Sequence, residues 1–224
     1  MHIYLVRHPP PIGVEGLCYG RLDVAVSQQA TEAAAAAVSA EIPGETLQGA
    51  RIYCSPSSRC VELARRIASP REPTPAEDLM EMNFGQWQGL AWDDVPREEL
   101  DAWAKDVWRY RPGGGESAEM VAARWQRWLA QLPRSNGVVT NDRGSNDGGS
   151  NDGGSNDGRS VVAVTHAGVI RVALARAGQL DDNAALTAPV PFGSVHRLDF
   201  PPHRDVSAET FPEGGVEHMG VTNG

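Results

Sequence analysis

The chain has 224 residues, 41% of them hydrophobic, which suits one soluble globular domain with a substantial core better than two domains. Its formal net charge of −9 argues against general nucleic-acid binding, which requires a basic face. No run approaches the roughly 18–20 apolar residues of a membrane helix, and the N-terminus does not resemble a signal peptide, so we expect a cytoplasmic protein without a membrane partner.

The first half of the chain alternates between predicted strands and helices. Residues 3–6 form a short apolar run that ends at charged residues, as a buried strand does. Ser27 can cap the alanine-rich helix that follows it. Residues 51–54 read as a second strand, and residues 55–68 as a helix that opens at the Ser-Pro pair.

The second half begins with an aromatic segment, residues 85–115, which is irregular or short-helical and holds four of the six tryptophans. We expect it either to form a lid over a pocket or to supply plain packing residues. Residues 117–132 repeat apolar side chains at helical spacing. Residues 161–164 form an apolar strand, a helix follows His166, and residues 194–198 read as the last strand. The four tryptophans are Trp87, Trp92, Trp103 and Trp108.

This alternation of strands and helices predicts a three-layer α/β/α sandwich with a mainly parallel central sheet. We expect residues 1–205 to be one domain and residues 206–224 to be a C-terminal tail. Residues 141–160 repeat a polar pentapeptide with no apolar residue to bury, which predicts a flexible low-complexity insert. A calcium site built from its aspartates is the alternative, but the five-residue period matches no calcium-binding repeat.

The three cysteines, Cys18, Cys54 and Cys60, are too few and too scattered for a disulfide framework or a zinc site. We therefore expect neither a metal nor another cofactor, and a reducing environment. Because the net charge is negative, an anionic substrate would have to be attracted by a local cluster of arginines.

Such a cluster is predicted where the strands end. His8 follows the first strand and His166 a later one, while Arg7 precedes His8 and Arg59 opens the helix after the second strand. Ligands of parallel sheets bind at the carboxyl ends of the strands. Forked guanidinium donors match phosphate oxygens, and an imidazole held among them can attack phosphorus. Positioning and charge neutralisation dominate phosphoryl transfer, so these residues can perform it without a metal.

With three further motifs, these residues resemble the histidine phosphatase superfamily, whose fold is called phosphoglycerate-mutase-like. Five motifs occur in family order between residues 3 and about 198. They are Arg7-His8, the Ser-Pro-x-x-Arg run from Ser55 to Arg59, Glu81 three residues before Phe84-Gly85, Gly115-Glu116-Ser117, and His166-Ala167-Gly168. No single motif decides the resemblance, but their common order supports it.

The resemblance implies a role for each matching residue. His8 would be the phosphorylated nucleophile, and Arg7, Arg59 and His166 would clamp the phosphoryl group. Glu81 would give a proton to the leaving alcohol and then accept one from the attacking water. Repulsion between a carboxylate and a bound phosphate agrees with that role, because it favours the protonated acid.

A narrower resemblance is to the α-ribazole phosphatase branch, which serves cobalamin biosynthesis. It rests on residues 18–24 and on Arg59-Cys60, and it implies that Tyr19 and Gly20 lie on the phosphate-binding loop. The same stretch could instead be a structural turn before the first helix. The implied activity is a phosphomonoesterase, acting through a phosphohistidine on a small metabolite such as α-ribazole 5′-phosphate, in a monomer or a homodimer.

Three alternatives stay open: a phosphoglycerate mutase, a broad-specificity sugar phosphatase, and a non-catalytic protein that binds a phosphorylated ligand. The short segment 85–115 favours hydrolysis over a mutase, because mutases of the family usually have a longer lid. Two departures from the family concern activity and substrate choice. Pro9 replaces the usual glycine after the catalytic histidine and has no backbone donor, and residues 9–17 lack the asparagine that often contacts phosphate.

Overall fold

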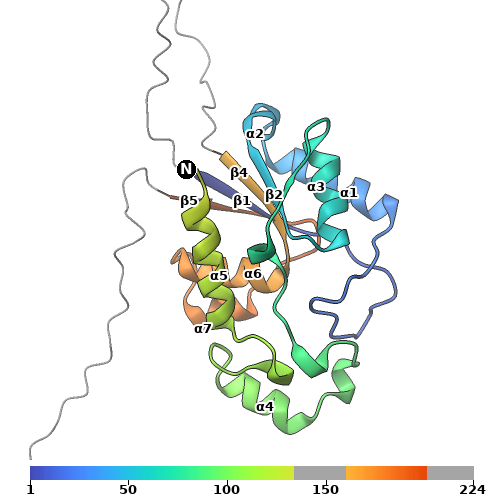
Figure 1. Ribbon diagram of the computed structural model, residues 1–224, viewed down its shortest axis with the longest axis vertical. Helices are drawn as coiled ribbons and strands as arrows, with labels where there is room; N and C mark the ends of the chain where they lie inside the picture. Colours follow the sequence, from blue (N-terminus) through green and yellow to red (C-terminus); the bar gives the residue numbers. More distant parts are fainter. Residues whose placement is uncertain (134–159, 201–224) are drawn as a thin grey trace, which may run out of the picture.

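The computed structural model describes residues 1–133 and 160–200 of the chain. A five-stranded sheet runs through its centre in the order β3-β2-β4-β1-β5 (Figure 1). The strands are β1 (His2–Arg7), β2 (Arg51–Cys54), β3 (Thr74–Pro75), β4 (Ser160–Thr165) and β5 (Val195–Asp199). β1, β2, β3 and β4 are parallel to one another, and β5 pairs with β1 in the antiparallel sense. This confirms the predicted α/β fold with a mainly parallel sheet, to which an antiparallel edge strand is added.

Helices cover both faces of the sheet (Figure 1), since each face carries its own cluster of buried apolar residues. One cluster joins the sheet to α5 and α6, and the other joins it to α1 and α3. The helices are α1 (Gln28–Glu41), α2 (Gly44–Gly49), α3 (Ser58–Ala68), α4 (Arg97–Lys105), α5 (Ala118–Gln131), α6 (Ala167–Arg176) and α7 (Asp182–Thr187). β4 is buried at every position, as expected of a strand covered on both sides.

The predicted helix starts are mostly confirmed. Ser27 and Ser117 cap α1 and α5, because each hydroxyl accepts a hydrogen bond from the backbone amide three residues later. α3 is the exception: it begins at Ser58 rather than at Ser55. Residues 55–57 form the turn before it, and Ser55 is fully buried there. α2, β3 and α7, all short, were not predicted.

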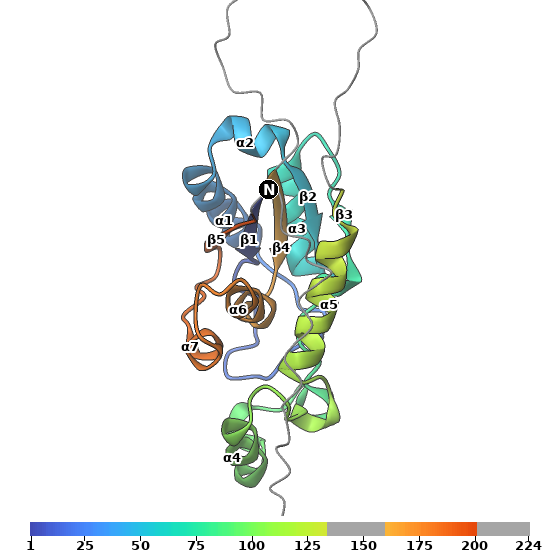
Figure 2. The same ribbon diagram turned by 90° about the vertical axis from the view of Figure 1, so that its left-hand side faces the viewer.

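Residues 85–115 lie beyond the carboxyl ends of the strands, and α4 lies at one end of the molecule, away from the sheet (Figure 1 and Figure 2). Short 3-10 turns, Gly85–Trp87, Trp92–Asp94 and Pro112–Gly114, flank α4. Trp87, Trp92 and Trp103 pack against one another, and the rings of Trp92 and Trp103 are stacked with centroids 6.3 Å apart. The packing interpretation therefore holds for these tryptophans, while a lid function stays a prediction.

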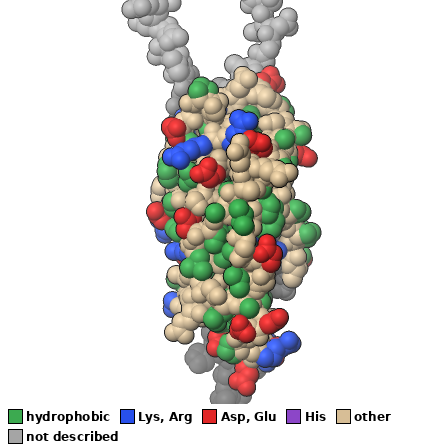
Figure 3. Space-filling view, turned by 90° about the vertical axis from the view of Figure 1, so that its right-hand side faces the viewer, with side chains coloured by type: hydrophobic (Ala, Val, Ile, Leu, Met, Phe, Trp, Pro, Cys, Tyr) green, Lys and Arg blue, Asp and Glu red, His purple; other side chains and the backbone are tan. Residues whose placement is uncertain are grey.

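Most of the pentapeptide repeat, and the predicted tail from residue 206 onward, lie outside the described residues. The last repeat residue, Ser160, belongs instead to β4, so that strand begins one residue earlier than predicted. Figure 3 shows one side of the molecule, where apolar side chains lie over the middle of the face and charged ones lie toward its two ends and along its edges. Within residues 1–133 and 160–200, no helix is long and apolar enough to cross a membrane.

Candidate active site

The two predicted site histidines lie next to each other. β1 and β4 are paired neighbours in which Arg7 lies opposite Thr165, so His8 and His166 leave the sheet at the same edge. The His8 amide donates a hydrogen bond to the Thr165 carbonyl at 3.1 Å. The two imidazole rings meet edge to face with their centroids 5.1 Å apart. The sheet register thus brings the two histidines together as predicted.

His8 is held as a neutral imidazole with one defined tautomer. Its Nδ1 lies 2.7 Å from the Pro9 carbonyl, which can only accept, so Nδ1 carries the proton and Nε2 has the free lone pair. The His8 pKa is lowered to about 3, chiefly by burial and next by the Arg59 guanidinium. Proline keeps the carbonyl that this bond needs, so Pro9 can replace glycine without loss of the contact.

His166 is fully buried and has the opposite tautomer. Its Nδ1 lies 3.2 Å from a terminal guanidinium nitrogen of Arg59, which can only donate, so the proton is on Nε2 and points to the Ser55 hydroxyl at 2.8 Å. Burial, followed by His8 and Arg59, lowers the His166 pKa well below its usual value. Both ring nitrogens are engaged, so the predicted phosphate contact of His166 would require one of these bonds to change.

Arg7 and Arg59 are cations without carboxylate partners among the described residues. Arg59 donates to the Gly20 and Leu22 carbonyls at 2.7 and 2.8 Å. Arg7 donates to the Val190 carbonyl and lies 3.7 Å from the centre of the Phe192 ring. Each keeps a buried Nε–H that bonds nothing in the described part of the chain. Two uncompensated guanidinium groups beside His8 form an anion site in an otherwise acidic protein.

The loop at residues 18–23 holds the Arg59 guanidinium in position through the Gly20 and Leu22 carbonyls. Gly20 has a φ of +40°, and a Cβ there would lie 2.5 Å from the Gln88 side-chain oxygen, so only glycine fits. The centre of the Tyr19 ring lies 5.3 Å from the Arg59 guanidinium carbon, and the Arg7 guanidinium donates a hydrogen bond to the Tyr19 hydroxyl oxygen. Burial raises the Tyr19 pKa, which keeps the phenol protonated as a donor. Direct contact of Tyr19 or Gly20 with phosphate stays a prediction.

Glu81 reaches the same edge of the sheet from the segment after β3. One carboxylate oxygen accepts a hydrogen bond from the Met82 amide at 2.9 Å, and the other faces the Gly168 amide at 3.4 Å. A Cβ at Gly168 would lie 2.4 Å from the Glu81 carboxylate. The glycine of the His-Ala-Gly motif therefore leaves room for the close approach of Glu81 to the start of α6.

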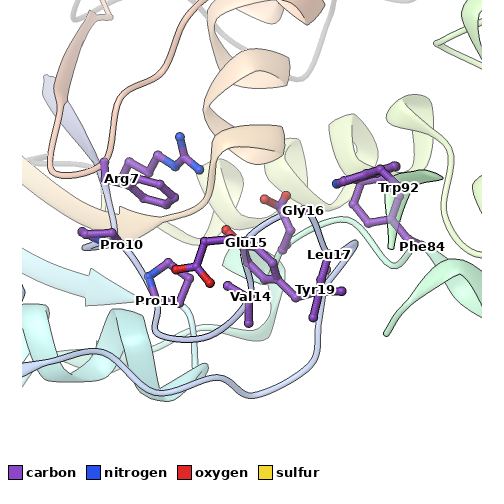
Figure 4. Close-up of a pocket in the computed structure, with 13 residues that line it drawn as sticks. Arg7, Pro10, Pro11, Val14, Glu15, Gly16, Leu17, Tyr19, Phe84 and Trp92 are labelled. Carbon is purple, nitrogen blue, oxygen red and sulfur yellow. The ribbon is translucent and has the colours of Figure 1, made fainter. Parts of the chain in front are cut away.

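A cleft of about 570 Å³ opens above these residues (Figure 4). Arg7 and Pro10 lie at one end of it and Phe84 and Trp92 at the other, with Glu15 and Tyr19 between them in this view. His8 is only 1% exposed, because Phe192 packs over it with ring centroids 5.5 Å apart. The lining residues are Arg7, Pro10, Pro11, Val14, Glu15, Gly16, Leu17, Tyr19, Gly20, Glu81, Phe84, Trp92 and Phe192.

The family model of the histidine phosphatase superfamily (branch 1) matches residues 3–140, more than half of the chain. This chain belongs to the histidine phosphatase superfamily. A curated relative, the 6-phosphofructo-2-kinase/fructose-2,6-bisphosphatase of Caenorhabditis elegans, is 28% identical over 98 residues, which are 42% of this chain. The match spans only 21% of that relative, about a fifth of its length.

Solved structures share the histidine phosphatase fold. The α-ribazole phosphatase of Shigella flexneri has a TM-score of 0.66 and 22% identity, with 90% of this chain and 91% of that chain covered. A mycobacterial glucosyl-3-phosphoglycerate phosphatase has a TM-score of 0.65 and 25% identity, with 88% of each chain covered. At these identities the likeness concerns the fold, and it confirms the predicted phosphoglycerate-mutase-like architecture.

An ion cluster of Glu116, Arg21 and Arg124, of which Arg124 is buried and the other two are partly buried, fixes the Glu81 segment. Glu116 accepts from Arg21 at 2.9 Å, from Arg124 at 3.2 Å and from the Asn83 amide at 2.9 Å. Arg21 also donates to the Glu81 carbonyl at 2.9 Å. The Gly-Glu-Ser motif therefore positions the segment that carries the proposed acid, rather than contacting the reacting atoms.

The sequence patterns did not predict roles for two members of this cluster, Arg21 and Arg124, or for Phe192, which packs over His8. Arg124 had a signal: it lies on the apolar stripe of its helix between Val121 and Trp128, where a charge needs a buried partner. Arg21 lies within residues 18–24, the stretch that resembles the α-ribazole phosphatase branch, but that resemblance implies no role for it. Phe192 had no signal, because a single aromatic residue in a loop does not reveal what it covers.

Proposed function

We propose that this histidine phosphatase is a phosphomonoesterase that acts through a phosphohistidine on His8. One observation carries the proposal: the neutral His8, with its Nε2 lone pair free, lies beside two guanidinium groups that no carboxylate of the described residues neutralises. A phosphate dianion would satisfy both cations. Membership of the superfamily supports phosphatase chemistry in general. The individual steps are inferred from the geometry of the site.

In the first step, His8 Nε2 attacks phosphorus while the bond from phosphorus to the alcohol oxygen breaks. Arg7 and Arg59 offset the charge on the equatorial oxygens, the role that metal ions have in other phosphoryl-transfer enzymes. Glu81 gives its proton to the departing oxygen, so the alcohol leaves neutral. The Nδ1–H bond to the Pro9 carbonyl stabilises the positive charge that the imidazole acquires.

In the second step, water attacks the phosphohistidine from the position that the alcohol has left. Glu81, now a carboxylate, accepts the proton of this water, and the bond between phosphorus and Nε2 breaks to restore neutral His8. Inorganic phosphate then departs. His166 supports both steps indirectly. Its Nδ1 holds the Arg59 guanidinium in position, and the Ser55 hydroxyl orients the His166 ring through Nε2.

Hydrolysis of p-nitrophenyl phosphate by the purified protein, with and without a chelator, tests the activity and its independence of a metal. We expect equal turnover in both conditions. A non-catalytic protein that binds a phosphorylated ligand would give no turnover above a His8→Ala control. Full activity only without the chelator would contradict the role given to the arginines.

For the substrate, we propose α-ribazole 5′-phosphate. The proposal is supported by residues 18–24, which form the loop that holds Arg59, and by the aromatic end of the cleft at Trp92, which can receive a flat base. The test is kcat/KM for this nucleotide against 3-phosphoglycerate and common sugar phosphates. A preference of tenfold or more for any competitor would contradict the assignment.

A further inference from the structure

The cleft carries a charge that the proposed chemistry does not use. Glu15 is exposed, lines the cleft, and has neither an ion pair nor a hydrogen bond among the described residues. Figure 4 shows its side chain between Pro11 and Tyr19, within the cleft. The carboxylate therefore faces whatever the cleft holds, and it meets no cation that would cancel its charge.

The positive charge of the cleft is concentrated at its phosphate end. Among residues 1–133 and 160–200, Arg7 is the one cation that lines the cleft, and Arg59 lies buried beside His8. Both belong to the proposed phosphate site. Apart from the Glu15 and Glu81 carboxylates, the remaining walls are apolar or aromatic, and Phe84 and Trp92 form the end away from Arg7 (Figure 4). A second anionic group on a substrate would thus find no cation there.

Trp92 presents a fixed surface at that far end. Its ring is stacked on Trp103 and meets Phe84 and Trp87 edge to face, so three neighbouring rings hold it in place. A flat uncharged group can pack on such a ring. The Glu15 side chain lies between the Arg7 end and the Trp92 end of the cleft (Figure 4). A group bonded to the ester oxygen that extends toward Trp92 therefore passes Glu15, at a separation on the order of the Debye length of about 8 Å at physiological ionic strength.

We infer that Glu15 is a specificity-determining residue that rejects phosphomonoesters whose alcohol part bears a second negative charge. The substrate class is then a phosphate ester of an uncharged alcohol, with hydroxyl groups that can donate to Glu15 and a flat part that can pack on Trp92. This inference rests on the proposed phosphatase function. It concerns which esters are hydrolysed, and it leaves the chemistry at His8 unchanged.

A matched pair of substrates isolates the effect. Glycerol 3-phosphate and 3-phosphoglycerate differ only in a hydroxymethyl group against a carboxylate. We expect wild-type kcat/KM to favour glycerol 3-phosphate, and the Glu15→Gln variant to reduce that preference by about three- to tenfold, as expected for like charges at this separation. The wild-type preference should also shrink as salt is raised, because the repulsion is screened.

The control variant is Glu41→Gln, which removes the same charge from an exposed residue that does not line the cleft. It should leave the ratio of the two kcat/KM values at the wild-type level. An unchanged ratio in Glu15→Gln, or a wild-type preference for 3-phosphoglycerate, would overturn the inference. If wild type hydrolyses neither ester and does not hydrolyse p-nitrophenyl phosphate either, the proposed function fails. Calorimetric binding of the same two compounds to wild type and Glu15→Gln then still tests Glu15, and equal preferences in the two proteins would overturn the inference.

Discussion

His8 and His166 are chemically different residues, although each follows a parallel strand directly. A backbone carbonyl at Nδ1 leaves Nε2 of His8 free to attack, whereas Arg59 and Ser55 engage both nitrogens of His166. The difference comes from partners rather than from burial, because both side chains are almost fully enclosed. One histidine is therefore suited to be the nucleophile, and the other to hold the arginine beside it.

Glu81 is predicted to matter only when the leaving group needs a proton. Replacing Glu81 with Gln should slow phosphorylation by an alkyl phosphate by roughly 10²–10⁴, the usual contribution of a positioned acid. With p-nitrophenyl phosphate, whose phenolate leaves readily, the loss in the same step should be much smaller. Single-turnover quench measurements on both esters compare the two. An equal loss for both would rule out proton donation by Glu81.

At the scale of elements, the start of α6 and the segment after β3 form one unit of the site. Gly168 lies in the first turn of α6 and lets the Glu81 carboxylate approach its amide. The Glu116 cluster holds the same segment from the other side through Arg21. The position of the proposed acid is thus fixed by contacts between elements that are far apart in sequence.

The variant Gly168→Ala should displace Glu81 without unfolding the protein. The added methyl group would lie 2.4 Å from the carboxylate, so Glu81 must move, while alanine itself suits a helix better than glycine. We expect a selective loss for alkyl phosphates that resembles the loss in Glu81→Gln, with a melting temperature close to that of wild type. Gly44→Ala, a helical position where the added Cβ meets nothing within 4 Å, is the control. Wild-type activity in Gly168→Ala would refute the positioning argument.

Across the whole molecule, sequence patterns predicted which residues lie at the strand ends better than they predicted the contacts between distant segments. Arg7, His8, Arg59 and His166 could be placed at one edge because apolar strands followed by polar residues are local signals. The Glu116 cluster and the Phe192 cover could not, since they depend on contacts between distant loops. The antiparallel direction of β5 was likewise not predicted, because an edge strand has the same apolar pattern in either direction.

Burial of neutral histidines should make the stability of the whole protein depend on pH. The unfolded chain binds a proton at His8 below about pH 6.5, whereas the folded protein does not until about pH 3. Stability due to His8 is therefore full above pH 6.5 and is lost as the pH falls toward 3. Lowering the pH from 7 to 5 should cost about 2 kcal/mol through His8 alone.

Urea unfolding at pH 7 and pH 5 measures this effect, with His8→Asn as the comparison. The variant should lose about 2 kcal/mol less than wild type between the two pH values, whatever its stability at pH 7. His166 contributes in the same direction in both proteins, because burial, the main cause of its lowered pKa, is kept in the variant. Equal losses in wild type and variant would show that His8 is not held neutral.

The central claim is that His8 carries the phosphoryl group, and chemical trapping tests it most directly. Wild-type protein mixed with radiolabelled phosphomonoester and quenched within milliseconds should carry phosphate that is stable in alkali and labile in acid. Peptide mapping should place the label on His8, and His8→Ala should lose both label and turnover. Label on another residue, or a His8→Ala variant that keeps most of its activity, would contradict the account.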